Sequence, residues 1–285
     1  MNIWRNVPTE RSNYWTEQLF RYNGKEMDGA VKEDLKQFLD ELVVRYNTPD
    51  FIESDPVSIP HSFSSPEDIE VAGFFSAIIA WGNRKSIVRN ADALMKRMDR
   101  EPFRFVKEAS ERELMPLADF VHRTFNGRDC IYFVKALRAI FARYGSLGGY
   151  FQQSYAQCGD MRQVLAGFWH CFFALEHDKR VEKHLSNIER GAACKRLNMY
   201  VKWMVRKDNG GVDFGLWRRI PASALYLPLD IHTGNTGRML GLLKRRQNDW
   251  RAVEEITGAL REFDGADPVK YDYALFGAGI DKIIR

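Results

Sequence analysis

The sequence predicts an all-α protein of about ten helices. Three observations support this: apolar residues recur at helical spacing, alternating strand-like patterns are scarce, and the prolines fall between the periodic segments. The 285 residues are 45% hydrophobic and 28% charged, which is typical of a folded chain rather than a disordered one. This length accommodates one large domain or two smaller helical lobes.

The first helices are predicted from an apolar stripe and a capping signal. Apolar residues between 35 and 46 follow the spacing of one amphipathic helix. Ser65 is expected to cap the next helix, over 66–81, which should stop at Gly82 and be followed by a helix over 85–98. Further helices are predicted over 129–144, 161–177, 195–206, 231–243, 249–263 and 268–283.

Residues 1–30 show no clear periodicity and are expected to form an N-terminal extension, which leaves 31–285 as the helical region. The longest nearly unbroken apolar run, 71–81, is about half the length needed to cross a bilayer. The N-terminal residues have neither an apolar core nor a small-residue cleavage site, so no signal peptide is expected.

The four cysteines argue against disulfides and against a cysteine-bound metal. Cys130, Cys158, Cys171 and Cys194 form no C-x-x-C pair, so neither a disulfide framework nor a cysteine zinc or iron–sulfur site is predicted. A reducing, cytoplasmic location without a membrane partner is therefore expected.

Basic residues are concentrated in one part of the sequence. The whole chain has a net charge of +4, whereas residues 195–251 contain twelve Lys and Arg and only four Asp. Such a segment is typical of a protein that binds a polyanion, but a solvated helical surface gives the same pattern. Both interpretations stay open on charge alone.

A lysine begins one of the predicted helices. Lys195 follows the small-residue turn Gly191-Ala-Ala-Cys. The positive end of the helix dipole disfavours a protonated amine at this place, and an amine kept neutral can act as a nucleophile. A solvated surface lysine is the ordinary alternative.

An aspartate stands at the head of another predicted helix. Asp230 ends an apolar run and is expected to cap the helix that follows. Gly234, Gly237 and Gly241 come next, and each costs about 1 kcal/mol relative to alanine inside a helix. Three glycines on one short helix indicate that another backbone or a ligand approaches closely.

These two motifs, and the spacing between them, resemble a known superfamily. Asp230 comes 35 residues after Lys195, in the pattern P-x-D-x-H-x-x-x-x-x-R-x-L-G-L. The pair resembles the helix-hairpin-helix DNA glycosylases, and most of all their archaeal 8-oxoguanine glycosylase branch. Residues 73–87, GFFSAIIAWGNRKSI, are similar to the early glycosylase helix and the loop that meets the damaged strand. The chain also resembles an uncharacterised bacterial domain family, through the runs CKRLNMYVKWMVR, DPVSIPHSF and DPVKYDYALFGAGI.

The resemblance implies two helical lobes with a cleft between them, and a cofactor-free action on damaged double-stranded DNA in base excision repair. It implies that Lys195 attacks the sugar C1′ of a flipped nucleotide and forms a Schiff base, while Asp230 activates Lys195 and stabilises positive charge on the sugar. The damaged base, an oxidised purine in the archaeal branch, must leave the stack. The residues implied to contact DNA or substrate are Trp81, Asn83, Lys85, Arg196, His232 and Arg238.

One part of the glycosylase pattern is missing, and two other functions stay open. Residues 186–194, SNIERGAAC, replace the glycine-rich hairpin that presents backbone N–H groups to a phosphate. The first alternative is a non-enzymatic helical nucleic-acid-binding protein. The second is a helical metal-dependent phosphohydrolase that uses His177 and Asp178 with His122 or His170. The sequence does not predict the oligomeric state.

Overall fold

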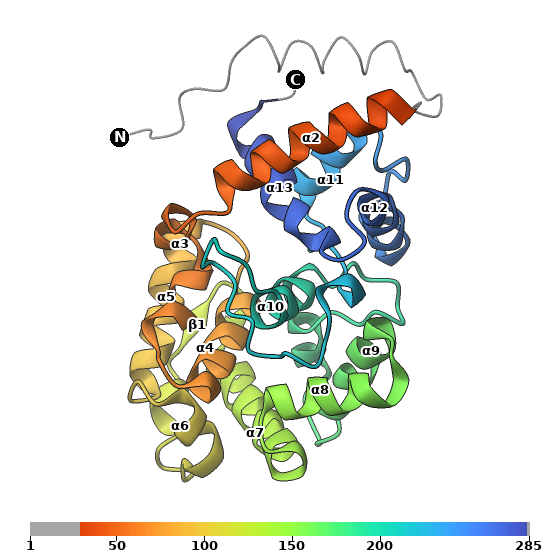
Figure 1. Cartoon of the computed structure of the whole chain (residues 1–285). Coiled ribbons are helices and arrows are strands. Elements are labelled where there is room, and N and C mark those ends of the chain that lie inside the picture. Colours follow the sequence, from red (N-terminus) through yellow and green to blue (C-terminus); the bar gives the residue numbers. More distant parts are fainter. Residues whose placement is uncertain (1–28, 284–285) are drawn as a thin grey trace.

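The computed structural model describes residues 29–283, and helices dominate this part of the chain (Figure 1). The predicted all-α class is confirmed, since the strands described are β1 (Val121–His122) and β2 (Phe125–Asn126), a short antiparallel hairpin. The α-helices are α2 (Gly29–Tyr46), α3 (Asp50–Ser54), α4 (Pro66–Ile78), α5 (Arg84–Arg97), α6 (Pro102–Glu108), α7 (Gly127–Tyr144), α8 (Leu147–Cys158), α9 (Met161–Phe172), α10 (Lys195–Val205), α11 (Ile231–Met239), α12 (Trp250–Phe263) and α13 (Tyr271–Asp281). The 3₁₀ segments are η1 (Pro56–Ser58), η2 (Pro60–Ser62), η3 (Met115–Leu117), η4 (Lys179–His184), η5 (Ala222–Ala224) and η6 (Pro268–Lys270).

The helices form two neighbouring groups that share one apolar core. In Figure 1, α2, α11, α12 and α13 gather at the top, while α3 to α9 lie below, with α10 between the groups. Helix α13 packs against both α2 and α11, and α10 packs against α4. A continuous cluster of buried apolar side chains runs through both groups. The expected extension over residues 1–30 lies almost entirely outside the described residues.

Helix α2 carries the predicted apolar stripe, and its buried side chains face α13. At its C-terminal end, the ring of Tyr46 lies against Gly277, where any side chain on the glycine would collide with it. The Tyr46 hydroxyl donates a hydrogen bond of 2.6 Å to Asp281. The stripe predicted from spacing alone therefore packs α2 against α13.

Most predicted helices are present, and the errors lie at their ends. Ser65 caps α4 as predicted, accepting a hydrogen bond from the Asp68 N–H at 3.4 Å. Helix α4 ends at Ile78, before the predicted end, because the chain turns into a segment that leads to Gly82 with φ +103°. Helix α11 ends at Met239, because the next turn closes through Gly241 with φ +72°.

Helix α9 is shorter than the sequence predicts. It ends at Phe172, because Phe173 turns its ring onto Tyr132, with the ring planes 8° apart and the centroids separated by 5.9 Å. Asp178 does not extend this helix but caps η4, accepting a hydrogen bond from the Arg180 N–H at 3.0 Å. Tertiary packing overrides the local helical pattern here.

Helix α8 was not predicted, because two glycines weaken its helical signal. Ser146 caps it through the Gly149 N–H at 3.0 Å. At Gly148 a side chain would collide with the buried Glu70, which accepts hydrogen bonds from the Gly148 N–H at 2.9 Å and from Trp217 Nε1 at 2.8 Å. The glycine is needed for this close approach. Helices α3 and α6 also lie outside the predicted ranges.

The C-terminal end of α10 is held by a buried charged network. Arg206 is 2% exposed, and its guanidinium binds Asp208, Asp213 at 3.0 Å and Asp267 at 2.8 Å. These contacts join α10 to the loop that follows it and to the chain before α13. Several charges are thereby held within the protein and do not contribute to its surface.

Candidate functional site

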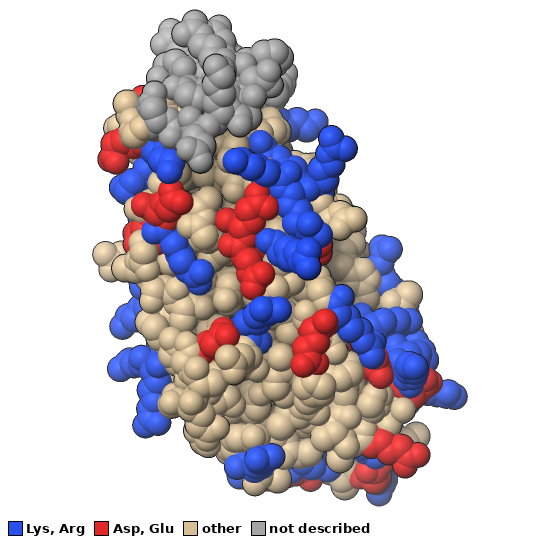
Figure 2. All heavy atoms as spheres, turned by 90° about the vertical axis from the view of Figure 1, so that its right-hand side faces the viewer, with Lys and Arg blue, Asp and Glu red and all other residues tan. Residues whose placement is uncertain are grey.

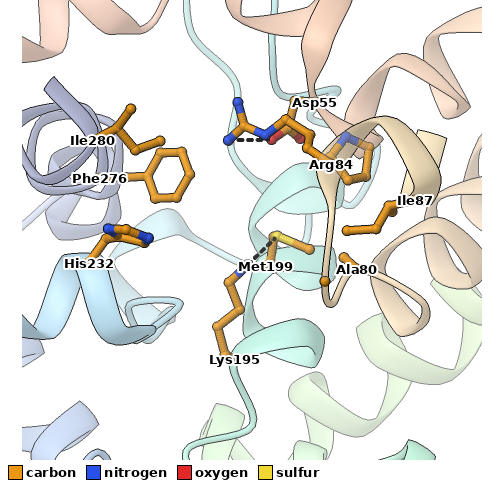
Figure 3. Close-up of a pocket in the computed structure, with 11 residues that line it drawn as sticks. Asp55, Ala80, Arg84, Ile87, Lys195, Met199, His232, Phe276 and Ile280 are labelled. Atoms are coloured by element: carbon orange, nitrogen blue, oxygen red, sulfur yellow. Dashed lines mark hydrogen bonds and ion pairs between the residues drawn. The ribbon is translucent and has the colours of Figure 1, made fainter. Parts of the chain in front are cut away.

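A pocket of about 280 Å³ opens between the two groups of helices (Figure 3). The chain before η1, the α4–α5 loop, α5, α10, α11 and α13 all contribute to it. Its lining residues are Asp55, Pro56, Ala80, Gly82, Arg84, Ile87, Lys195, Met199, His232, Phe276 and Ile280. Two residues that the sequence analysis selected, Lys195 and His232, thus meet at one place although they begin different helices.

Lys195 is the first residue of α10, as predicted. Cys194 precedes it in a left-handed conformation with φ +48°, and no side chain caps this helix end. The lysine is half-buried, and its Nζ lies 3.2 Å from the sulfur of Met199, one turn further along. Among residues 29–283, no carboxylate forms an ion pair with this amine. Since a thioether is a weak acceptor, the amine stays available to a ligand in the pocket.

The pocket is a slot with two largely apolar sides. Figure 3 shows Phe276, Ile280 and His232 on one side, from α13 and α11, and Met199, Ala80 and Ile87 on the other. Phe276 and His232 contact each other edge to face, with centroids 6.2 Å apart. Lys195 lies at one end of the slot, and Asp55 with Arg84 lies at the other (Figure 3).

Asp55 was not identified from the sequence, although the run DPVSIPHSF begins with it. It caps η1, since its Oδ1 accepts a hydrogen bond from the Val57 N–H at 3.1 Å. Its Oδ2 lies 3.8 Å from Nη2 of Arg84. Burial raises the pKa of Asp55, against the opposing effect of the positive charges on Arg84 and Lys195. Local sequence gives no signal that this cap faces Lys195, because the two come from distant parts of the chain.

Asp230 caps α11 as predicted, and its Oδ1 accepts a hydrogen bond from the Thr233 N–H at 2.9 Å. The carboxylate does not line the slot, whereas His232, two residues later, does. Asn248 donates to the Asp230 carbonyl at 3.0 Å, and the following residue, Asp249, forms a β-bridge with Ala192 just before α10. The beginnings of α10 and α11 are therefore tied together through the loop before α12.

The close approach predicted at the α11 glycines is made by protein groups. A Cβ at Gly237 would lie 2.5 Å from Cδ1 of Ile256 on α12, and one at Gly234 would lie 2.9 Å from Oδ1 of Asn248. Gly241 lies beyond the helix and serves its terminal turn. These glycines let the loop before α12 and α12 itself pack tightly on α11.

Trp81 and Arg196 lie within the protein framework behind the slot. The Arg196 guanidinium covers the Trp81 ring at 4.9 Å and donates to the Ile78 carbonyl. Burial lowers the pKa of Arg196 to about 10. The ring of His184 also stacks on Trp81, with the ring centroids 6.0 Å apart. Arg196 thus holds the α4–α5 loop through the Trp81 ring and the Ile78 carbonyl.

The remaining predicted contact residues divide into two kinds. Arg238 donates to the Arg245 carbonyl at 2.8 Å and to Asn248 at 2.5 Å, which shapes the loop before α12. Asn83 caps α5 through the Ser86 N–H at 3.1 Å but is exposed. Lys85 is exposed at the start of α5, and His232, which lines the slot, is also exposed to solvent. These last three remain accessible to a large ligand.

The basic segment does not form one uniformly basic surface. Lys202 and Arg206 are buried, and Lys202 pairs with Asp272 at 2.9 Å. Figure 2 shows one face of the molecule, on which Lys and Arg side chains alternate with Asp and Glu. The exposed basic residues of the segment are Lys207, Arg218, Arg219, Lys244, Arg246 and Arg251.

The residues of the alternative metal site are engaged elsewhere. His122 binds Asn90 at 2.9 Å, His170 binds Glu189 at 2.7 Å, and His177 binds the Leu175 carbonyl at 2.7 Å. Within residues 29–283, no group of three or more His, Cys, Asp or Glu could hold a metal ion. The phosphohydrolase interpretation therefore gains no support from this part of the chain.

Acid is expected to destabilise the fold through His184, which is 2% exposed and bonded to Asp129 at 3.1 Å. Burial lowers the pKa of His184 to about 4 from an ordinary 6.5, because Asp129 offsets the burial only in part. The unfolded chain binds more protons between these values, so stability falls as the pH drops from 6.5 toward 4. The contribution is at most about 3 kcal/mol. Urea unfolding at several pH values should show a smaller loss for His184→Gln, which does not titrate. Equal losses in both proteins would contradict the assignment.

Among residues 29–283, no helix is both long and apolar enough to cross a membrane. A family model described as "Protein of unknown function (DUF2400)" matches residues 55–281. No curated protein and no solved structure matches the chain. The matched segment begins with Asp55 and contains every residue that lines the slot.

Proposed function

Because the chain belongs to the DUF2400 family and the segment matched to it contains the whole slot, we propose that this slot is the active site of a DNA glycosylase with AP lyase activity. The observation that supports this best is the Lys195 amine, which opens a helix, has no carboxylate partner among residues 29–283 and faces the slot. An amine that makes no ion pair within the protein is free to form a bond to a carbon of a ligand in the slot.

The slot suits one flat aromatic ligand. Phe276 lies on one side of the slot, and the sulfur and methyl of Met199 lie on the other. Aromatic and thioether groups pack well against a planar ring. A volume of about 280 Å³ is at the small end of ligand sites, which fits a single base removed from the stack.

In the proposed reaction, unprotonated Lys195 Nζ forms a bond to the sugar C1′ while the glycosidic C–N bond breaks. The base leaves with the bonding electrons and takes up a proton. Nζ then loses a proton, the sugar ring opens, and its ring oxygen takes up a proton, which gives a Schiff base. Loss of a C2′ proton expels the 3′ phosphate and cuts the strand. Asp230 lies outside the slot that takes the base, two residues before His232, and from there its fixed negative charge would stabilise the cationic sugar.

Two further features support the glycosylase-like fold and a double-stranded DNA partner. The first is a short helix, a turn and a second helix in succession, formed by η4, the turn before Ala192 and α10. In that turn, the Gly191 N–H donates to the Ile188 carbonyl at 2.9 Å. Exposed Asn83 and Lys85 lie beside the slot at the start of α5, where a strand entering the slot would meet them. The two helical groups would then be the lobes that flank the DNA.

Borohydride trapping tests the proposal. The protein is incubated with duplexes that carry an abasic site or one of several damaged bases, and borohydride reduces any Schiff base to a stable amine. A covalent adduct at Lys195, located by peptide mass, is the expected result. The absence of any adduct, together with salt-sensitive DNA binding, would instead favour the non-enzymatic nucleic-acid-binding protein.

Asp230→Asn is expected to slow base release strongly while DNA binding and stability stay close to wild type. Asparagine caps a helix as well as aspartate does, so the hydrogen bond to the Thr233 N–H survives and only the negative charge is lost. Single-turnover base release, filter binding and the melting temperature check this together. Unfolding of the variant, or unchanged release, would contradict the catalytic role of the carboxylate.

A further inference from the structure

Asp55 and Arg84 close the end of the slot opposite Lys195, and the protein leaves part of their hydrogen-bonding capacity unused (Figure 3). Oδ1 of Asp55 is occupied by the Val57 N–H, whereas Oδ2 accepts no hydrogen bond from the described residues. Nη2 of Arg84 lies 3.8 Å from Oδ2, which is beyond hydrogen-bond distance. An acceptor and a donor therefore stand side by side with room for a ligand edge to reach both.

The protein holds the positions of both groups. Arg84 lies over the Phe276 ring at 5.3 Å, and its Nη1 reaches the Ser54 hydroxyl at 3.4 Å. Asp55 is 7% exposed and its orientation is set by the cap that it forms on η1. Since reorganisation is small, hydrogen bonds to these groups discriminate well between ligands.

We propose that Asp55 and Arg84 read the edge of the base and select those with a ring N–H beside a carbonyl oxygen. This rests on the proposed function in taking a flipped base as the ligand. The N–H donates to the Asp55 carboxylate, and the carbonyl accepts from the Arg84 guanidinium. Guanine, hypoxanthine, uracil and thymine have such an edge. When held in the same orientation, adenine and cytosine present an amino group to Arg84 and a ring acceptor to Asp55, which sets donor against donor and acceptor against acceptor.

Hypoxanthine and adenine form a matched pair for the test, because among their hydrogen-bonding groups they differ only at this edge. The free bases are titrated into protein labelled with ¹³C on the methionine methyls, and the Met199 signal is assigned with Met199→Leu. Hypoxanthine is expected to shift that signal with a dissociation constant lower than that of adenine by about tenfold or more.

Asp55→Asn is expected to abolish or reverse the preference. The cap on η1 keeps the amide oxygen toward the Val57 N–H, so the amide NH₂ replaces the free acceptor with a donor. Because asparagine also caps, this variant should fold. Glu53→Gln, which removes an exposed charge from neighbouring α3 outside the slot, should keep the wild-type preference. Equal binding of both purines, no Met199 shift with either, or an unchanged preference in Asp55→Asn would overturn the proposal.

A separate measurement distinguishes failure of this proposal from failure of the proposed function. An abasic site contains no base to read, so the borohydride adduct that the wild-type protein forms there tests the lyase chemistry separately from the edge reading. Selective hypoxanthine binding without any wild-type adduct would refute the lyase chemistry and leave the edge reading intact. A wild-type adduct without selective hypoxanthine binding would refute the edge reading and leave the lyase chemistry intact.

Discussion

Lys195→Gln is expected to abolish the borohydride adduct and to lower strand cleavage at an abasic site by about 10³-fold or more. Glutamine keeps most of the length and polarity of the side chain but has no amine that can form a Schiff base. The lysine is half-buried, and its one hydrogen bond within residues 29–283 goes to the Met199 sulfur, so its loss should cost little stability. Gel-based trapping and single-turnover cleavage measure the effect.

The matched control for this variant is Lys107→Gln. Lys107 is exposed on α6 and lies outside the slot, so its replacement removes the same charge without touching the proposed nucleophile. It should trap and cleave as wild type does. Retention of the adduct in Lys195→Gln would show that another amine reacts, and the assignment of this residue would then be wrong.

Arg206→Met is expected to lower the free energy of unfolding by about 3–5 kcal/mol, the typical cost of removing one partner from a buried ion pair. The guanidinium is 2% exposed and is the shared partner of Asp208, Asp213 and Asp267. Asp213 is also buried, and burial raises its pKa, against the opposing effect of the positive charges on Lys202 and Arg206. Urea unfolding measures the change.

Arg219→Met serves as its control, because Arg219 is exposed and its side chain enters no ion pair among the described residues. A change within about 0.5 kcal/mol is expected there, as for most surface substitutions. If Arg206→Met were as mild as this control, the network would not hold α10 to the chain before α13. Should Arg206→Met fail to fold, Asp267→Asn offers a gentler variant, since it removes one carboxylate and leaves two.

The sequence predicted the helices and the residues that begin them, because caps and apolar stripes are local signals. Ser65 and Asp230 cap where their types and positions indicate, and Lys195 opens α10. Helix ends were less predictable, since packing on distant rings and left-handed glycines ends α9 and α11 early. Helix α8 was not predicted because Gly148, near its start, is required by a contact with Glu70, which lies 78 residues away in the sequence.

The site was predicted only in part, for the same reason. Lys195 and His232 belong to recognisable motifs, whereas Asp55, Met199 and Phe276 become slot residues only when three distant segments meet. The number of basic residues in 195–251 also overstated the charge of the surface. Arg206 is one of them, but it is buried in an ion pair with Asp267, which lies 61 residues further along the chain. Partners of this kind are set by the tertiary fold and leave no local pattern.

The packing of α2 along α13 bears on where an autonomously folding unit begins. The family match starts at Asp55 and so excludes α2, yet the ring of Tyr46 fills the space above Gly277 and its hydroxyl holds Asp281. A fragment cut at the family boundary would expose the apolar back of α13 to water and invite aggregation. Because α13 carries Phe276, the slot wall itself depends on residues upstream of the segment by which the family is recognised.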